Sequence, residues 1–283
     1  MGTEPVTEPG AARPAPTDAA DWPLVLDSEL MRAGEAMIPA GDDGLIRGDG
    51  AFDAFPVRDG RPFARAAHLD RLERSCAALM LPCPRAQIEA DVDLLLTRAP
   101  GGYTVVRVVL TRGGHRICRL ESAGDRAALS RPARLLPVTY DPSVLLNGVK
   151  SLSYAANMLA SRQAAAEGYD EALMVGSEGT VLEGPTCSIF WVRGGRLCTP
   201  ALETGILASI TRRVILESMV PVHEGLFPLE DLLGAQEAFL VSTARLAQPI
   251  AAIGPAALPA APGPQTTRAQ GAIERAMDEA SIA

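Results

Sequence analysis

The sequence predicts a mixed α/β (α+β) protein of two domains, and three observations lead to this prediction. The chain has 283 residues, enough to bury a sizeable core. Segments typical of strands alternate with segments typical of helices in both halves. A proline-containing connector over residues 128–140 separates the halves. We therefore expect a disordered tail over residues 1–20, an N-terminal α/β domain over 21–133 and a C-terminal α/β domain over 134–283.

The N-terminal half reads as strands around one helix. Strands are expected at residues 23–31, at 103–114, and as a pair within 50–63 that folds back over an Asp-Gly turn. A helix is expected over 68–81, because apolar side chains recur there at helical spacing. Its expected buried residues are Leu69, Leu72, Cys76, Leu79 and Met80, and Pro82 and Pro84 end it.

The C-terminal half continues the alternation. A helix is expected over residues 154–167, closed by Gly168, and another begins near Thr211. Strands are expected at residues 171–176, 188–200 and 237–243. The Pro/Ala-rich stretch from Pro255 to Pro264 reads as a second tail.

Composition narrows the class of protein. A net charge of -8 and a pI near 5.0 argue against nucleic acid or an anionic membrane as partner. No apolar run reaches the length of a membrane span, and the first residues lack the apolar core of a secretory signal, so we expect a cytoplasmic protein. The three histidines are too scattered to predict a metal site. Without CxxC spacing, the cysteines are expected to be reduced thiols, namely Cys76, Cys83, Cys118, Cys187 and Cys198.

Lys150 stands in the stretch "LLNGVKSLSYAANMLA", with no other lysine for several turns on either side. One interpretation is a surface lysine at a helix start, although a cation there opposes the helix dipole. The neighbours Val149, Leu152 and Tyr154 indicate partial burial instead, which lowers the pKa of an amine and favours its nucleophilic form. Lys150 is therefore a candidate Schiff-base lysine.

Glu183 ends the strand-like stretch "TVLE" and is followed by Gly-Pro-Thr-Cys-Ser. An exposed acid at a strand end is one interpretation. The other is an anion held at fixed depth beside a site, for instance one that keeps a pyridine nitrogen protonated.

Three segments offer donors to an anion such as phosphate. Ser209, Ile210 and Thr211 precede an amphipathic helix, whose N-terminus suits an anion, and plain N-capping is the alternative. Arg71, on the first predicted helix, is either a solvated charge or a fork on a phosphate. The turn at residues 242–244 offers backbone N–H groups or is simply a turn.

In this order, these segments resemble the class IV aminotransferases, the pyridoxal-phosphate enzymes of fold type IV. That family includes branched-chain aminotransferases, D-amino acid aminotransferases and aminodeoxychorismate lyases. The resemblance runs from Leu26 to Ile253 and is carried by "GDGAFDAF", "HLDRLERS", "VKSLSYAANMLASRQAAAEGYDEALMV", "VLEGPTCSIFWV", "TGILASITRRVILE" and "FLVSTARLAQPI". It implies a D-amino acid aminotransferase-like fold of two α/β domains, with pyridoxal 5'-phosphate in the cleft between them, and a homodimer.

For the cofactor, the resemblance implies a residue for each part. Lys150 matches the catalytic lysine that forms a Schiff base with C4′, and Glu183 matches the acid that pairs with the pyridine nitrogen. Tyr154 lies one residue closer to the lysine than the tyrosine that contacts the phenolic oxygen in branched-chain enzymes, so a one-residue deletion in the loop would give it that role. The phosphate is expected to bind Arg71, Ser209, Ile210, Thr211 and Thr243.

For the substrate, the resemblance implies a smaller set. Phe52 is similar in position to an aromatic residue that lines the side-chain pocket. The amides of Thr243 and Ala244 match those that receive the substrate carboxylate.

One arginine is also expected to meet a substrate carboxylate. The stretch "RVVLTRGGHRI", with Arg107, Arg112 and Arg116, resembles D-amino acid aminotransferases and aminodeoxychorismate lyases, and Arg112 is the expected contact. Surface charges flanking a turn are the alternative. Ser188 stands where many members carry Asn, and Pro56 where bacterial branched-chain enzymes carry an arginine, so the side-chain preference stays open.

The predicted function is a PLP-dependent aminotransferase acting between a small or branched-chain amino acid and a 2-keto acid. The alternative is aminodeoxychorismate lyase, which expels a leaving group from Cβ and releases pyruvate and 4-aminobenzoate. A non-catalytic cofactor-binding protein is a third interpretation. The motifs are shared by transaminases and lyases, so they leave the reaction outcome and the L or D stereochemistry open.

Overall fold

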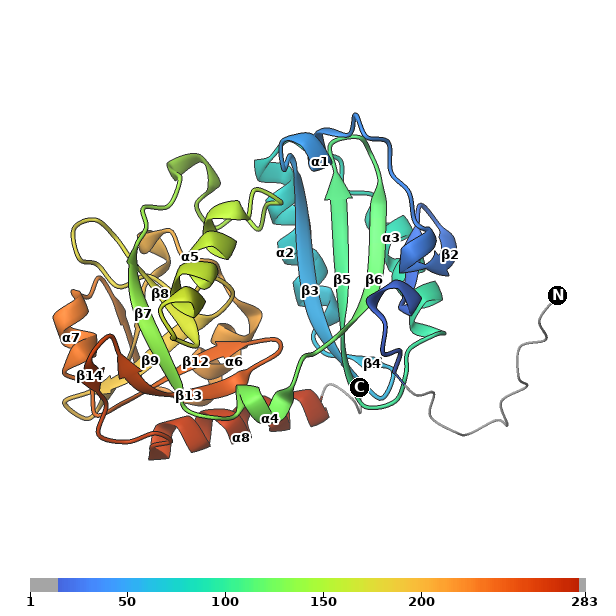
Figure 1. Cartoon of the computed structure of the whole chain (residues 1–283). Coiled ribbons are helices and arrows are strands. Elements are labelled where there is room, and N and C mark those ends of the chain that lie inside the picture. Colours follow the sequence, from blue (N-terminus) through green and yellow to red (C-terminus); the bar gives the residue numbers. More distant parts are fainter. Residues whose placement is uncertain (1–14, 280–283) are drawn as a thin grey trace.

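Two β-sheets, each formed by one half of the described chain, organise the structure (Figure 1). The computed structural model describes residues 15–279, so most of the tail expected over residues 1–20 lies outside the described residues. The remainder of that segment includes the start of a 3-10 turn, η1 (Ala19–Asp21), capped by the side chain of Asp18.

The first sheet is antiparallel throughout, in the order β2-β1-β6-β5-β3-β4. Its strands are β1 (Pro23–Leu26), β2 (Glu29–Arg32), β3 (Gly50–Arg58), β4 (Arg61–Pro62), β5 (Tyr103–Thr111) and β6 (Arg116–Ser122). The segment predicted as one strand at residues 23–31 is a hairpin, because Asp27 and Ser28 both take positive φ. The predicted turn at Asp59–Gly60 joins β3 to β4, and both residues have positive φ.

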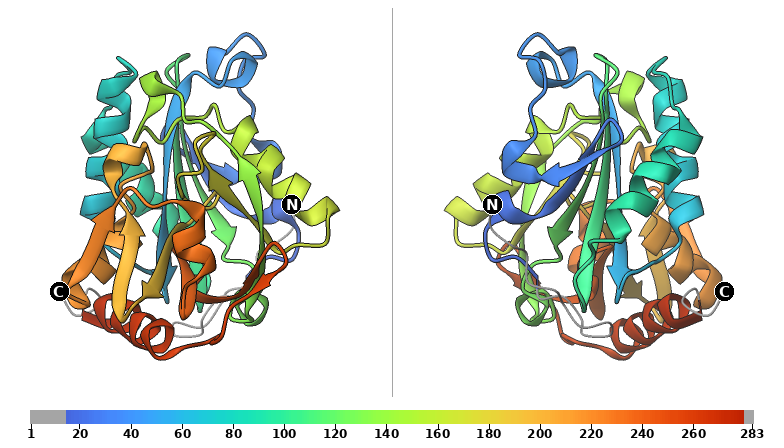
Figure 2. Two further views of the ribbon diagram at one scale, coloured as in Figure 1. Left: turned by 90° about the vertical axis from the view of Figure 1, so that its left-hand side faces the viewer. Right: turned by 90° about the vertical axis from the view of Figure 1, so that its right-hand side faces the viewer.

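Two helices cover one face of the first sheet (Figure 2). α2 (Arg65–Ala78) packs against β3, and α3 (Arg85–Leu96) packs against β1 and β6. α1 (Asp43–Ile46) and the 3-10 turn η2 (Ala33–Glu35) lie in the connection before β3. α2 buries Leu69, Leu72 and Cys76 as predicted, but Met80 is 86% exposed, because the helix ends at Ala78 and Met80 takes positive φ.

The opposite face of this sheet lines a cavity. Both faces can serve different purposes because successive side chains of a strand point to opposite faces. On β3, Phe55 and Val57 point to the helices and belong to the core, whereas Phe52 and Ala54 line a cavity. On β5, Val106 and Val108 are core residues in the same way. The period of two thus places core and cavity residues on the same strands.

The second sheet has the order β11-β10-β9-β12-β13-β7-β8, with β14 beside β13. Its strands are β7 (Ala133–Thr139), β8 (Glu171–Val175), β9 (Ser188–Arg193), β10 (Arg196–Pro200), β11 (Val222–Gly225), β12 (Glu237–Ser242), β13 (Leu246–Ile253) and β14 (Ala256–Ala257). β7 runs parallel to β8 and β13, and β10 runs parallel to β11. The connector expected over residues 128–140 is therefore mostly strand, since Ala133 and Leu135 are buried in this core.

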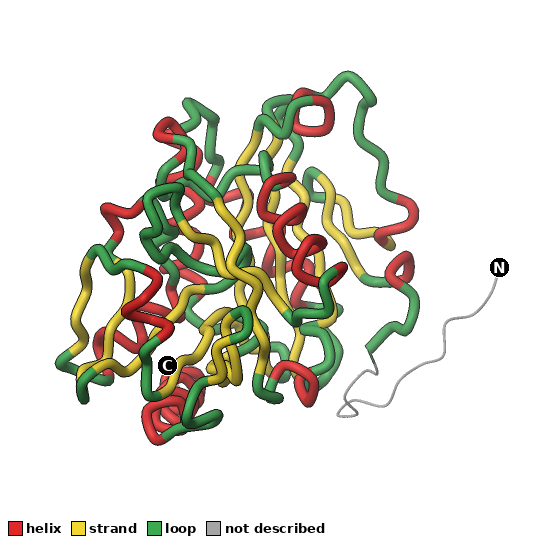
Figure 3. The backbone as a smooth tube through the Cα atoms, turned by 60° about the vertical axis from the view of Figure 1, so that its left-hand side comes forward, coloured by secondary structure: helices red, strands yellow, loops and turns green. Residues whose placement is uncertain are grey.

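Helices cover the second sheet on both faces, which is why its central strands read as continuous apolar runs. The helices and turns of this half are α4 (Arg126–Leu129), η3 (Val144–Leu146), α5 (Ala155–Ala166), η4 (Leu202–Thr204), α6 (Ile210–Ser218), α7 (Leu229–Leu233) and α8 (Pro264–Glu279). α5 packs against β7 and β8, and α6 and α8 pack together against β12. Figure 3 shows which parts of the described chain are helix, strand and loop.

The tail expected from Pro255 to Pro264 is ordered. It contains β14 and leads into α8, whose residues Ala269, Ile273 and Met277 are buried against the second sheet. The apolar face of α8 therefore holds the C-terminal end of the described chain in place.

Candidate active site

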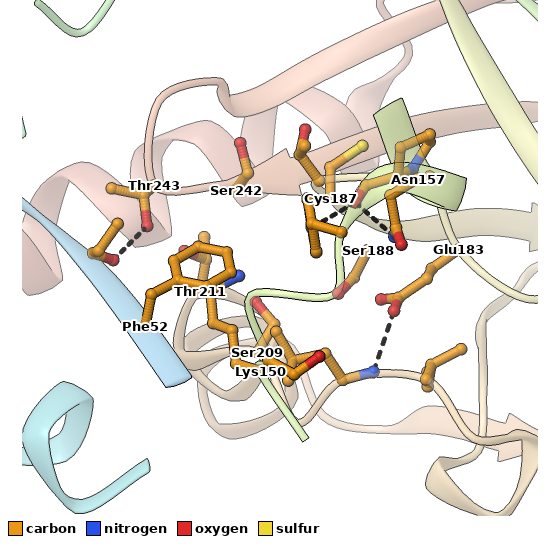
Figure 4. A pocket seen from close by; sticks show the side chains of 18 of the residues that line it. Phe52, Lys150, Asn157, Glu183, Cys187, Ser188, Ser209, Thr211, Ser242 and Thr243 are labelled. Atoms are coloured by element: carbon orange, nitrogen blue, oxygen red, sulfur yellow. Dashed lines mark hydrogen bonds between the residues drawn. The ribbon is translucent and has the colours of Figure 1, made fainter. Parts of the chain in front are cut away.

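Both sheets contribute to the wall of one cavity of about 630 Å³. Its polar lining side chains point into a common space from separate segments of the chain (Figure 4). The lining includes these residues singled out in the sequence: Phe52, Arg71, Lys150, Tyr154, Glu183, Ser209, Ile210, Thr211, Thr243 and Ala244. Arg112 is not among the lining residues.

Lys150 lies in a short extended segment that pairs with β3. The N–H of Phe52 donates to the carbonyl of Lys150 at 3.0 Å, and that of Leu152 donates to Gly50 at 2.9 Å. The N–H of Lys150 donates to Oγ of Ser75 on α2 at 3.1 Å. Because α5 begins only at Ala155, Lys150 is not at a helix start, and the expected conflict with a helix dipole does not arise.

The amine of Lys150 borders the cavity beside two aromatic rings. Nζ lies 4.4 Å from the ring centroid of Phe52 and 5.6 Å from that of Tyr154. Burial, together with the charge of Arg71, lowers the pKa of Lys150 to about 8. Lys150 is the only lysine in the 283-residue sequence. Near neutral pH a much larger share of this amine is therefore neutral than in an ordinary lysine, and the neutral form can act as a nucleophile or base.

Glu183 presents a buried carboxylate to the same cavity. Its carbonyl accepts from the N–H of Met174 at 2.9 Å, which fixes the backbone against β8. Its Oε1 accepts from the N–H of Leu207 at 3.0 Å (Figure 4). Burial raises the pKa of Glu183 to about 7, although this hydrogen bond and the charge of Lys150 oppose the rise. A cationic group bound beside Glu183 would favour its ionised form.

The N-terminus of α6 lies at the cavity wall. Oγ of Ser209 accepts from the N–H of Arg212 at 3.2 Å, so Ser209 is the predicted N-cap. The amides of Ile210 and Thr211, in the first turn, remain directed toward a ligand. Nη1 of Arg71 donates to the carbonyl of Ala208 at 3.2 Å, immediately before this helix. The N-cap therefore leaves backbone amides of the first turn available to an anion.

The turn after β12 is anchored to the first sheet. The hydroxyl of Tyr103 donates to the carbonyl of Thr243 at 2.7 Å, and Oγ1 of Thr243 donates to the carbonyl of Ala54 at 3.4 Å. These bonds hold residues 243 and 244 at the cavity wall.

Tyr154 has its hydroxyl committed elsewhere. It donates to the carbonyl of Pro185 at 2.5 Å, and Nδ2 of Asn157 donates to the same oxygen at 3.0 Å. Burial raises the pKa of Tyr154. Its ring meets that of Phe52 edge to face, with centroids 5.3 Å apart. The contact expected with a phenolic oxygen stays a prediction, while the ring itself shapes the cavity.

The structure places Arg107, and not Arg112, at the cavity wall. Arg112 lies beyond the end of β5, where its guanidinium pairs with Asp49 at 3.0 Å and donates to the carbonyls of Leu79 and Met80. Arg107 faces the cavity instead, with Cζ 5.2 Å from the centroid of Phe52. Two of its nitrogens donate to Glu121, at 2.6 and 3.1 Å.

Several residues that line the cavity were not predicted from the sequence. Glu121, Asn157 and Arg245 all border the cavity. Strand alternation would have indicated Glu121, since it pairs with Val105 on the neighbouring strand. Asn157 follows Tyr154 by three residues at the start of a helix, which places both on one face.

The sequence and the fold are similar to those of known proteins. The sequence profile of amino-transferase class IV matches residues 50–253. The chain belongs to the class IV aminotransferases. It is 33% identical over 253 residues to a putative branched-chain-amino-acid aminotransferase of Methanocaldococcus jannaschii, covering 80% of this chain and 86% of that protein. It is 26% identical to an aminodeoxychorismate lyase of Bacillus subtilis, covering 78% and 83%.

Solved structures of class IV proteins share the fold. A hypothetical aminotransferase from Mycobacterium tuberculosis, in its PLP-bound form, superposes with a TM-score of 0.83 at 25% identity, over 91% of this chain and 99% of that one. Across residues 15–279, no helix of this class IV chain combines the length and apolarity needed to cross a membrane.

The lowered pKa of Lys150 leads to a first prediction. We expect modification of Lys150 by a small acylating reagent to rise with pH around a midpoint near 8, because only the neutral amine reacts. In the chemically unfolded chain, the midpoint should return toward the ordinary value of 10.5. Mass spectrometry of the peptide containing Lys150 measures the rate at each pH, free of other lysines. Coincident midpoints in the folded and unfolded chains would contradict the effect of burial.

Proposed function

We propose that this class IV chain is a pyridoxal-phosphate-dependent aminotransferase that moves an amino group between an amino acid and a 2-keto acid. The observation that carries the proposal is the convergence of three groups on one cavity. These are the amine of Lys150, the buried carboxylate of Glu183 and the anion site formed by Arg71 with the N-terminus of α6.

The residues present fit this cofactor. When bound, pyridoxal 5'-phosphate supplies an aldehyde and an electron-withdrawing ring that stabilises negative charge at the substrate Cα. Glu183 would hold a proton on the ring nitrogen, and Arg71 with the amides of Ile210 and Thr211 would bind the phosphate. Lys150 would hold the aldehyde and, once released by the incoming amine, its neutral Nζ would take the proton from the substrate Cα and deliver it to the carbon that had carried the aldehyde.

Similarity to known proteins supports a small or branched-chain substrate first, since the relative at 33% identity is a putative branched-chain-amino-acid aminotransferase. The 26% identity to an aminodeoxychorismate lyase supports lyase activity as the second candidate. Both reactions begin with removal of a proton by Lys150, so they differ only in where the electrons go next.

Absorbance of the holoprotein tests the proposal. We expect single L- or D-amino acids to convert the cofactor to its aminated form, with release of one 2-keto acid per site. Formation of pyruvate from aminodeoxychorismate without that change would favour the lyase. If no amine changes the spectrum, the chain binds the cofactor without turnover and the proposed function is wrong.

Arg107 provides a prediction about substrate binding. We expect Arg107→Met to raise KM for the 2-keto acid about tenfold with a smaller effect on kcat, because it removes a cation facing the cavity that can meet a substrate carboxylate. Arg112→Met is the matched control and should change KM by less than about twofold, since Arg112 is bound to Asp49 outside the cavity. Steady-state kinetics of both variants measure the difference. The reverse order would return the substrate-binding role to Arg112.

We also propose a cytoplasmic homodimer in which the two sheets mark the two domains, divided between residues 133 and 134. Large apolar side chains exposed around the molecule support an interface between copies. Leu45 is 61%, Val144 84% and Leu145 89% exposed. Sedimentation of the holoprotein tests the oligomer, and replacing Val144 and Leu145 by serine should weaken it.

A further inference from the structure

Arg71 contacts groups from both halves of the molecule. It projects from α2, which packs on the first sheet, and is 5% exposed. Its Nε and Nη2 each donate to one carboxylate oxygen of Asp53, both at 2.8 Å. Its Nη1 instead donates to the carbonyl of Ala208, in the loop that leads into α6 on the second sheet. One guanidinium therefore joins the two elements that would hold the phosphate.

Asp53 has no exposed surface, and its Oδ1 accepts from the N–H of the next residue, Ala54, at 2.7 Å. It lies on β3 between Phe52 and Ala54, which line the cavity, while its own side chain points to the helix face. Besides Arg71, it accepts from Nδ1 of His68 at 2.8 Å. Although burial alone would raise the pKa of Asp53, the hydrogen bonds from His68 and Arg71 hold it well below its usual range. Asp53 is thus a fixed anion beneath the arginine.

We infer that Asp53 is a positioning residue for the cofactor phosphate, an inference that rests on the proposed function. The bidentate pair with Asp53 fixes the plane of the guanidinium and directs Nη1 to the N-terminus of α6. Arg71 from one half and the amides of Ile210 and Thr211 from the other then act as a single anion site. Without the pair, the long arginine side chain would sample other rotamers and the site would lose its shape.

The negative charge of Asp53 and its orientation of Arg71 have opposite effects on phosphate binding, which makes the inference testable. An anion beneath the site repels phosphate, so if Asp53 acted through its charge alone, Asp53→Asn would tighten binding. If Asp53 acts by orienting Arg71, the same change weakens binding, by about tenfold to a hundredfold for the loss of a charge-assisted bidentate pair. The sign of the change therefore distinguishes the two mechanisms.

The experiment measures cofactor affinity. Cofactor is removed from the wild-type holoprotein and from Asp53→Asn, and each is titrated with pyridoxal 5'-phosphate and, in competition, with inorganic phosphate. We expect both ligands to bind the variant more weakly. The matched control is Asp91→Asn, which removes another buried carboxylate, on α3 against the same sheet, bound to Arg116 at 2.9 Å and Ser28 at 2.9 Å. Its cofactor affinity should stay within about twofold of wild type.

A double-mutant cycle separates positioning from general damage to the fold. In the Arg71→Met background, Asp53→Asn should change cofactor affinity by less than about twofold, because the group that Asp53 orients is gone. If Asp53→Asn does not fold, Asp53→Glu takes its place; it keeps the charge, displaces the carboxylate by one methylene and should still weaken binding. Unchanged or tighter binding in the folded variant, or equal losses in both backgrounds, would overturn the inference. Failure of wild type to bind the cofactor would overturn the proposed function instead.

Discussion

Replacing Lys150 with alanine is expected to reduce transamination by at least about a thousandfold, because one side chain both holds the cofactor and moves the Cα proton. The protein should still bind the cofactor through Arg71 and the N-terminus of α6, but without a covalent bond. Turnover assays at saturating cofactor measure the loss, and mass spectrometry after borohydride reduction measures covalent attachment.

The sequence supplies the control for this experiment. Since Lys150 is the only lysine, reduction of the wild-type holoprotein should add one cofactor mass to a single lysine-containing peptide. The Lys150→Ala variant should show no such addition while keeping a circular dichroism spectrum like that of wild type. A variant that still carried the cofactor covalently would remove Lys150 from its proposed role.

Replacing Glu183 with glutamine is expected to lower kcat by about a hundredfold or more, because an amide cannot supply the negative charge that stabilises a protonated ring nitrogen. The amide has nearly the same shape and keeps an oxygen for the N–H of Leu207, so the local fold should persist. Burial that raises the pKa of Glu183 to about 7 also places its charge change near neutral pH, where an opposing cation would hold it ionised.

Measurements of kcat across pH for wild type and Glu183→Gln, with cofactor occupancy measured in parallel, test this prediction. Glu178→Gln is the matched control, since Glu178 is exposed in the turn preceding the same strand-like segment and does not line the cavity. We expect the control to retain wild-type kcat within about twofold. Loss of activity in both variants, or in neither, would show that the position of Glu183 is not what matters.

Much of the secondary structure could be predicted from the local spacing of apolar residues. The helix that was not predicted follows two prolines. The helical spacing of Leu69, Leu72 and Cys76 predicted the buried face of α2. The next helix, α3, was missed because two prolines read as a stop, although Ile88 and Val92 follow at helical spacing. Prolines mark where one helix ends, but not whether another begins.

Local sequence pattern alone does not predict which residues meet in the candidate site. The two halves of the proposed phosphate site lie 138 residues apart in sequence, at Arg71 and Ser209, and only a family resemblance could join them before the fold was known. Arg107 and Arg112 look equivalent along the chain. Their roles separate because Arg107 faces the cavity from β5, whereas Arg112 lies past the end of that strand. Long-range geometry, rather than residue type, decides between them.

The alternation along β3 has an evolutionary consequence. Phe52 and Ala54 can change the chemistry of the pocket while Phe55 and Val57, one step along the same strand, keep the hydrophobic core intact. The residues that line the cavity and those that form the core thus occupy separate, interleaved positions, and the first set can change by point substitution with little effect on the second. An insertion or deletion within the strand would exchange the two sets at once. We therefore expect descendants of this sequence to diversify at every second residue of β3 while conserving its length.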